Sequence, residues 1–138
     1  MVAARSSIAL QAEPAHRIVG REPGWIWPYA GLPRDFINDQ MGQLMPVIKA
    51  AKLPCIWIGP PWGQEGGFYK KSNARVKALS DYLSQNVAPC HYVDSLPSSK
   101  PGELTTLDGV HLTPDATRLW DAYVMRSIDQ IAATLPRQ

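Results

Sequence analysis

The chain has 138 residues, 45% of them hydrophobic, and a formal net charge of +2 at pH 7. This length fits one domain with its own core, and the hydrophobic content excludes a disordered tail. Lysine and arginine are scattered, and no run of about 18 apolar residues occurs, so we expect neither nucleic-acid binding nor a membrane span.

Residues 1–34 are rich in proline and glycine, which predicts little regular structure. We expect this segment to be a long loop that covers the core of a single domain, residues 1–138. The N-terminal apolar stretch is too short and interrupted for a signal peptide. The sequence as written therefore predicts a cytoplasmic protein, whereas a longer parent protein could be secreted or periplasmic.

Helix and strand patterns alternate after this segment. Apolar residues recur at helical spacing from residue 35 to residue 51, where Pro46 should kink or interrupt the helix. Residues 55–59 then read as a short buried strand. Ser72 is the expected cap of a helix that ends before Pro89. Its buried face should contain Val76, Leu79, Leu83 and Val87.

A second strand is predicted in PCHYVDSL, where His91 should be partly buried and hydrogen-bonded. The last helix should start with Thr113 as N-cap and Pro114 in its first turn, and run to about Leu135. Its apolar face is expected to contain Leu119, Trp120, Tyr123, Val124, Ile128 and Ile131. This order of elements predicts an α/β fold with a short parallel sheet.

The two cysteines occur in a repeated pattern. LPCIWIG and APCHYVD both read P-C-x-[WY]-[IV], 35 residues apart, so parallel pairing in register would make Cys55 and Cys90 neighbours. A disulfide would then be within reach, but buried free thiols are expected in a cytosolic chain. Neither cysteine has zinc spacing, and we expect no metal or other cofactor.

The segment LDGVHLTPDA places Asp108 three residues before His111, directly ahead of the last helix. Ligands of parallel α/β proteins gather at such helix starts and at the carboxyl ends of the strands. A histidine there can act as a general base if a carboxylate orients its ring. The alternative is that Asp108 only caps a turn and His111 is an ordinary polar loop residue.

Several segments together resemble the C-terminal part of the SGNH hydrolases, the GDSL-type esterases and lipases. They are WIGPP, a loop with F-Y and Asn73, YVDS, and DGVHLTPDATRLWDAYV, within residues 36–135. The resemblance implies a reduced three-layer α/β/α, flavodoxin-like fold. It also implies that His111 is the base of a Ser-His-Asp triad and Asp108 its orienting acid.

The chain departs from this family in two segments. It has no G-D-S nucleophile segment and no G-x-N-D segment for the oxyanion hole, and Asn38-Asp39 lies in a helical pattern. The candidate nucleophiles are therefore Ser6, Ser7 and Ser95, or a water activated by His111. His16 reads as an exposed loop residue, and Cys55 has no histidine partner in the sequence.

The loop after the first predicted strand is the candidate substrate wall, formed by Gly59, Pro60 and Trp62, although Trp62 could equally cover the core. The predicted function is hydrolysis of a small carboxylic ester. One alternative is a catalytically incomplete binding or structural module, which could be a homo-oligomer that pairs its exposed strand edges. Acyl transfer to a sugar is a further alternative.

Overall fold

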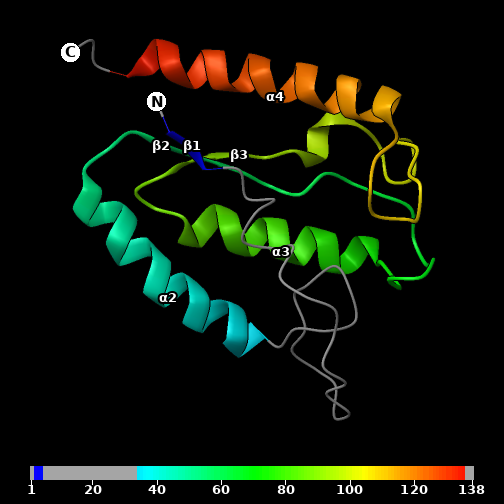
Figure 1. The fold of residues 1–138 in the computed structure, drawn as a ribbon, viewed down its shortest axis with the longest axis horizontal. Helices are drawn as coiled ribbons and strands as arrows, with labels where there is room; N and C mark the ends of the chain where they lie inside the picture. The colour runs from blue at the N-terminus through cyan, green and yellow to red at the C-terminus, as the bar shows by residue number, and fades with distance from the viewer. Residues whose placement is uncertain (1, 5–33, 136–138) are drawn as a thin grey trace.

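The structure is a computed structural model that describes residues 2–4 and 34–135 (Figure 1). Its elements in chain order are β1 (Val2–Ala4), α2 (Arg34–Ala51), β2 (Cys55–Ile58), α3 (Asn73–Asn86), β3 (His91–Val93), the 3-10 helix η1 (Leu96–Ser98) and α4 (Pro114–Thr134). The predicted mixed α/β fold with a short parallel sheet is confirmed. None of the described helices is long and apolar enough to cross a membrane.

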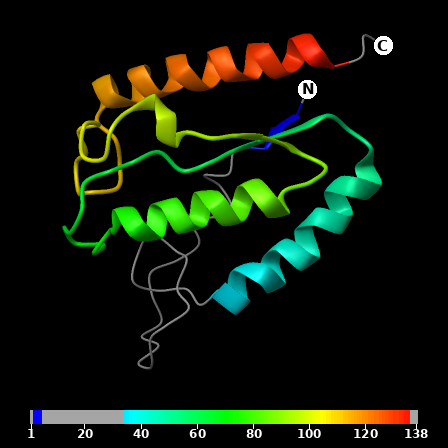
Figure 2. The same ribbon diagram turned by 180° about the vertical axis from the view of Figure 1, so that it is seen from behind.

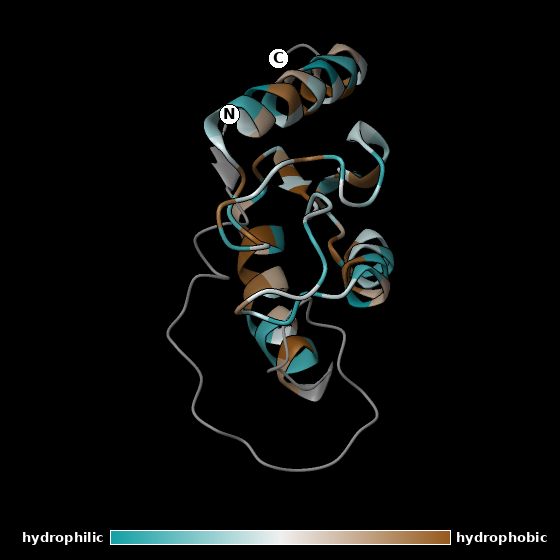
Figure 3. Cartoon of the chain, turned by 90° about the vertical axis from the view of Figure 1, so that its right-hand side faces the viewer, coloured by the Kyte–Doolittle hydropathy of each residue, from teal (hydrophilic) through white to brown (hydrophobic). Residues whose placement is uncertain are grey.

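The sheet has the strand order β1-β2-β3, and both pairs are parallel. Helix α4 lies on one side of it, with α3 and α2 on the other (Figures 1 and 2). Helix α4 contacts β3 from its own side of the sheet, and hydrophobic and hydrophilic residues alternate along each helix (Figure 3). The strands therefore occupy the middle of the molecule.

Strand β1 was not predicted, because residues 1–34 were expected to be irregular. Val2–Ala4 pairs with Cys55–Trp57 of β2. The strand depends on a partner distant in the sequence, so the local composition did not reveal it. Residues 5–33, including the segment expected to cover the core, lie outside the described residues.

The main core cluster lies between the sheet and the pair α2 and α3. It contains Ile37, Met41, Cys55, Trp57, Leu79, Tyr82, Leu83, Val87 and Cys90. The buried face predicted for the third helix is confirmed, since Val76, Leu79, Leu83 and Val87 are all buried. The strand and helix boundaries are within a residue or two of those predicted.

Helix α4 departs from its predicted face. Ala116 and Val124 are its buried residues, whereas Leu119 is 69% exposed. Residues 116, 120 and 124 lie one above another along the helix and face the sheet, which leaves Leu119 on the flank. The prediction that Leu119 packs into the core is therefore wrong.

Two local expectations, an interruption of α2 at Pro46 and a side-chain cap of α3 by Ser72, also need correction. Helix α2 continues through Pro46 without interruption. The carbonyl that loses its bond belongs to exposed Gly42, where water can bind it. Ser72 occupies the N-cap of α3 but makes no side-chain cap bond. Instead, Oε1 of Glu65 accepts the hydrogen bond from the Asn73 amide at 2.9 Å.

The cysteines form a disulfide, Cys55–Cys90, with the two Cα atoms 4.5 Å apart. The expectation of free thiols is therefore wrong, although the predicted neighbourhood is confirmed. Pairing of Ile56 with His91 places the residues that precede them, Cys55 and Cys90, side by side. The bond ties the first residue of β2 to the residue just before β3, and the candidate site lies beyond the other ends of these strands.

Candidate functional site

The loop before α4 is closed on itself like a small hairpin. The Thr113 amide donates to the Thr105 carbonyl at 3.0 Å, and the Leu107 amide donates to the His111 carbonyl at 2.8 Å. The hydroxyls of Thr105 and Thr113 lie 2.6 Å apart. Thr113 also caps α4 as predicted, by accepting from the Ala116 amide. The backbone around Asp108 and His111 is thus fixed from both sides.

The same loop is bound to the loop that follows β2. The Gln64 amide donates to the Gly109 carbonyl at 3.1 Å, and the Thr106 hydroxyl donates to Oε1 of Gln64 at 2.6 Å. Gly109 has φ +92°, and a Cβ there would lie 3.3 Å from the Gln64 carbonyl oxygen. A glycine is therefore needed at this position both for its backbone conformation and for the close approach of the two loops.

The structure brings the two predicted residues Asp108 and His111 together. Oδ2 of Asp108 lies 2.5 Å from Nδ1 of His111. The other carboxylate oxygen accepts from the amides of Val110 at 3.0 Å and His111 at 2.8 Å. Asp108 therefore stabilises the turn and orients the imidazole at the same time, which combines the two alternatives posed by the sequence.

These contacts determine the charge of the pair. The amide hydrogen bond from His111, followed by the ring contact, lowers the pKa of Asp108 to about 2. Asp108 is therefore an ionised acceptor at neutral pH, so the proton of a neutral imidazole belongs on Nδ1. The His111 side chain is 54% exposed, and Nε2 bonds to no residue that the structure describes. Its lone pair can accept a proton from a bound molecule.

Exposed apolar side chains lie on the loops near this histidine. The Tyr69 ring lies edge-on to the His111 ring with centroids 6.1 Å apart, and Phe68 lies edge-on to Tyr69 at 5.1 Å. Phe68 is 86% exposed and Leu107, one residue before Asp108, is 74% exposed. We call Phe68, Tyr69 and Leu107 the apolar rim. In the sequence, Phe68 and Tyr69 contributed only to the resemblance to the SGNH hydrolases, and neither ring was given a role.

Lys71 is a second residue that the sequence analysis missed. It is 6% exposed, and burial lowers the pKa of its ammonium to about 8, with Asp108 acting in the opposite direction. The sequence provided little indication that Lys71 is buried, because two adjacent lysines are typical of a solvent-exposed surface. Only the fold shows that the second lysine turns inward beside the Asp108 loop.

The structure does not bring Ser95 to His111. Ser95 follows β3 as predicted, but it is completely buried, and its hydroxyl accepts a hydrogen bond from the Trp120 indole at 3.0 Å. This serine joins α4 to the end of the sheet, and a substrate cannot reach it in this arrangement. Ser6 and Ser7, the other candidate nucleophiles, and His16 lie outside the described residues.

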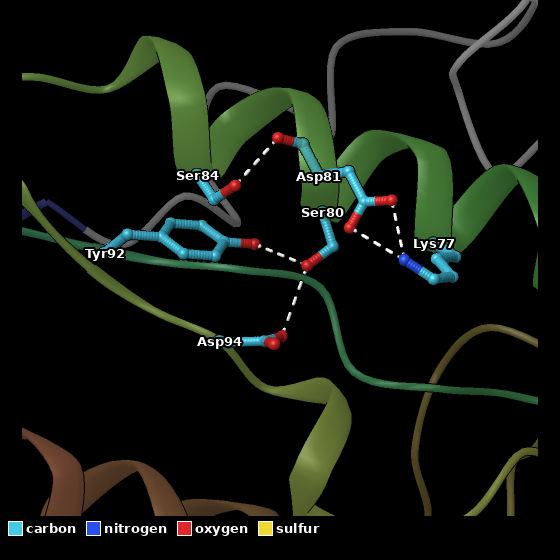
Figure 4. A network of polar contacts seen from close by, with 6 residues as sticks. All are labelled: Lys77, Ser80, Asp81, Ser84, Tyr92 and Asp94. Carbon is cyan, nitrogen blue, oxygen red and sulfur yellow. Dashed lines mark hydrogen bonds and ion pairs between the residues drawn. The ribbon is translucent and has the colours of Figure 1, made fainter.

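A partly buried polar network fixes the neighbouring strand end (Figure 4). The hydroxyls of Ser80 and Tyr92 lie 2.8 Å apart, and Ser80 also donates to Asp94 at 3.2 Å. Asp94 accepts from the Leu96 amide as well, at 3.0 Å. Burial raises the pKa of Tyr92 to about 12. The network joins α3 to β3 and does not include His111.

The three residues predicted to form a substrate wall differ in their burial. Gly59 is buried, its amide donates to the Val93 carbonyl at 2.9 Å, and an added Cβ would collide with the Tyr92 hydroxyl. Gly59 therefore serves close packing at the strand end. Pro60 and Trp62 are half-buried in the following loop. A hollow of about 360 Å³ lies elsewhere, between β3 and α4.

Two remaining predictions concern isolated residues. His91 was expected to be partly buried, but it is exposed, because it begins β3 at the edge of the sheet. Cys55 is part of the disulfide and so cannot be a nucleophile while that bond is intact. Within residues 2–4 and 34–135, no group of three or more histidine, cysteine, aspartate or glutamate side chains could hold a metal ion.

The chain is similar in sequence to a curated protein. The chain is 37% identical over 99 residues to Protein BcsX of Komagataeibacter xylinus. The match covers 71% of this chain, and the chain spans 37% of the length of BcsX. No protein-family model matches the chain, and no solved structure is significantly similar to it.

Proposed function

We propose that the chain carries the acid–base pair of an ester-hydrolase site of the SGNH type, with His111 as general base and Asp108 as its orienting acid. The main support is the 2.5 Å contact between Nδ1 of His111 and Oδ2 of Asp108. Two backbone amides hold the opposite carboxylate oxygen, so the pair is preorganised in an exposed loop. The parallel sheet with helices on both sides is compatible with the three-layer, flavodoxin-like fold of that family.

The chemistry follows from the orientation of the ring. Nε2 of His111 takes the proton of an attacking hydroxyl or water as the oxygen bonds to the ester carbonyl carbon. Asp108 stabilises the imidazolium that results. The same proton then passes to the departing alkoxide oxygen, and the alcohol leaves. With water as nucleophile this step yields the acid directly, whereas a serine first forms an acyl-serine that a water then hydrolyses.

The identity of the nucleophile depends on access to Nε2. The Ser95 hydroxyl is completely buried and bonded to Trp120, which makes it the weakest of the candidates. We therefore favour Ser6, Ser7 or a water molecule activated by His111. An experiment can distinguish a serine nucleophile from water. Replacement of both Ser6 and Ser7 by alanine would abolish hydrolysis through a serine but leave hydrolysis by water intact.

The apolar rim supports a small ester with an apolar acyl group as substrate. Phe68 and Leu107 expose most of their side chains beside the pair, and exposed apolar clusters commonly mark binding sites. Pro60 and Trp62, in the loop that precedes the rim in the chain, are retained as proposed wall residues. Replacing Phe68 by alanine should raise KM for a butyryl ester more than for an acetyl ester.

The disulfide supports an oxidising compartment as the place of action. Structural disulfides persist in secreted or periplasmic proteins and are rare in the cytosol. Cys55–Cys90 joins two buried cysteines inside the core, as a structural disulfide would. This favours the secreted or periplasmic alternative over the cytoplasmic location expected from the sequence.

The test is hydrolysis of a short-chain nitrophenyl ester by the wild type, His111→Ala and Asp108→Asn, with circular dichroism to confirm folding. His91→Ala is the matched control, since His91 is exposed at the opposite end of β3. Loss of the base should lower kcat/KM by about a hundredfold or more. Equal rates in the wild type and His111→Ala would reject the proposal. Added sugar in the same assay would reveal acyl transfer to that acceptor.

The second candidate is a binding or structural module without catalysis. The burial of Ser95 favours it, since of the three candidate serines Ser95 is the one within the described part of the chain. Pairing of sheet edges between copies would give a homo-oligomer. A solution mass above that of one chain, together with no esterase activity in any variant, would support this candidate instead.

A further inference from the structure

Three residues from the two loops of the site form a closed ring of hydrogen bonds. The Gly109 amide donates to the Thr106 hydroxyl at 3.0 Å, and that hydroxyl donates to Oε1 of Gln64 at 2.6 Å. The Gln64 amide completes the ring by donating to the Gly109 carbonyl at 3.1 Å. Each residue is therefore bonded to both of the others. We call Gln64, Thr106 and Gly109 the loop ring.

The chemistry of the groups determines the direction of each bond in the loop ring. An amide oxygen can only accept, so the Thr106 hydroxyl directs its proton to Gln64. A lone pair of the same hydroxyl then accepts from the Gly109 amide. The hydroxyl is thus donor and acceptor at once, and its removal breaks two of the three bonds.

The loop ring holds the most permissive backbone position of the D-x-x-H turn. Gly109 lies between Asp108 and the amides of Val110 and His111, which the Asp108 carboxylate binds. Glycine has the greatest backbone freedom of any residue, so Gly109 would loosen this turn if nothing restrained it. The ring bonds both its N–H and its C=O, so the peptide planes before and after Gly109 are both held.

The restraint matters because the pair itself is weakly held by packing. The His111 side chain is 54% exposed, so its position depends on Asp108 and on the turn that contains both residues. The bonds from Asp108 to the amides two and three residues later are local and move with the turn. Gln64, by contrast, precedes Thr106 by 42 residues and belongs to the loop that follows β2. The loop ring therefore fixes the turn relative to the sheet.

We propose that Gln64 and Thr106 are positioning residues that keep the Asp108 carboxylate aligned on Nδ1 of His111 by holding the peptide groups of Gly109. The inference rests on the proposed function for its purpose, because an aligned carboxylate is what a general-base histidine requires. Its physical content is a restraint on the turn, which can be measured without an ester. Both residues act through Gly109 and Asp108.

The test compares Thr106→Val, which removes the hydroxyl but keeps the shape, with Thr106→Ser, which keeps the hydroxyl. Gln64→Met removes the Oε1 acceptor from the other loop and keeps the backbone bond. Thr105→Val is the matched control, since the Thr105 hydroxyl bonds to Thr113 outside the loop ring. The measurements are the imidazole Nδ1 proton of His111 by NMR, hydrogen exchange of the Val110 and His111 amides, and thermal unfolding.

In Thr106→Val we expect the Val110 and His111 amides to exchange about tenfold faster, because two bonds that restrain the turn are lost. The Nδ1 proton should broaden or move upfield. Gln64→Met should change both signals in the same direction by a smaller amount. Thr106→Ser should resemble the wild type, and so should Thr105→Val in these two signals, even where its unfolding temperature falls.

Wild-type amide exchange and a wild-type Nδ1 proton in Thr106→Val and Gln64→Met would overturn the proposal. Equal changes in Thr105→Val would also overturn it, because any loss of a loop hydroxyl would then have the same effect. Gln64 is exposed, so Gln64→Met decides the question if Thr106→Val does not fold. A disturbed Nδ1 proton in a protein without esterase activity would support the positioning role and reject the proposed function.

Discussion

The two ends of β2 and β3 are built in different ways. At the start of the strands, Cys55 and Cys90 are buried, joined covalently and surrounded by apolar residues. At the far end, the Asp108 loop is held by hydrogen bonds to its own backbone and to the loop at Gln64. The exposed His111 and the apolar rim are at this second end.

Under the proposed function, this difference separates stability from chemistry within one small sheet. Covalent and apolar contacts tolerate little change but need no particular charge state. The hydrogen-bonded loop depends on an ionised carboxylate and on a glycine at positive φ. Carboxyl ends of parallel strands are where α/β proteins place their sites. The comparison predicts that changes at the disulfide end should mainly lower the free energy of unfolding. Changes at the other end should mainly alter the contact between Asp108 and His111.

The largest effect on stability should come from removal of the disulfide. Replacing both Cys55 and Cys90 by serine should lower the free energy of unfolding by about 2–4 kcal/mol, because the cross-link restricts the unfolded chain. Denaturant unfolding measures the loss, and the Nδ1 proton of His111 should keep its chemical shift in the folded protein. If that proton disappears while the protein stays folded, the two ends are coupled.

Ser95→Ala should have the next largest effect. The change leaves the part-buried hydrogen bond of the Trp120 indole N–H without its acceptor, which should cost about 1–3 kcal/mol of unfolding free energy. We expect esterase activity per folded molecule to be unchanged, because Ser95 lies in the core. Ser99→Ala is a suitable control for loss of a nearby hydroxyl. Abolished activity in a folded Ser95→Ala protein would restore Ser95 as the nucleophile.

The sequence predicted the elements whose signals are local. Periodicity located α3 and its buried face, Thr113 and Pro114 marked the start of α4, and the repeated P-C pattern predicted the register of β2 and β3. Each of these depends on residues close together in the chain. The D-x-x-H spacing likewise placed Asp108 and His111 within reach of each other.

The missed features depend on contacts between distant segments. Strand β1 exists through its pairing with β2, and Leu119 is exposed because α4 faces the sheet through residues on either side of it. Ser95 appeared accessible at a strand end, but Trp120, 25 residues later, covers it. The burial of Lys71 depends on Gly63 and Gly109, which no local pattern connects to it.

Gly109→Ala should act on the site end with a smaller effect on stability. Its φ of +92° is unfavourable for alanine, and the added Cβ would press on the Gln64 carbonyl, so we expect a loss of about 1–2 kcal/mol. The effect should appear mainly in the loop, as weaker amide protection at Gln64 and His111 in hydrogen exchange. Gly102→Ala is the matched control, since Gly102 also has positive φ but open space around it. Equal effects of the two changes would show that the loop contact is unimportant.

The smallest expected effect is a pH dependence that originates from Asp108. The carboxyl has a folded-state pKa of about 2, below its ordinary value of 3.8, so the folded state favours its charged form. Its stabilisation is complete above pH 3.8 and is lost as the pH falls toward 2. Asp108→Asn should therefore lose less unfolding free energy between pH 4 and pH 2 than the wild type. Asp115→Asn is the control, since Asp115 is an exposed carboxylate in the first turn of α4. Solvent screens the partly exposed Asp108, so the difference should be small. Identical acid unfolding in wild type and Asp108→Asn would mean that the turn amides and the imidazole hold the charged and neutral carboxyl equally well.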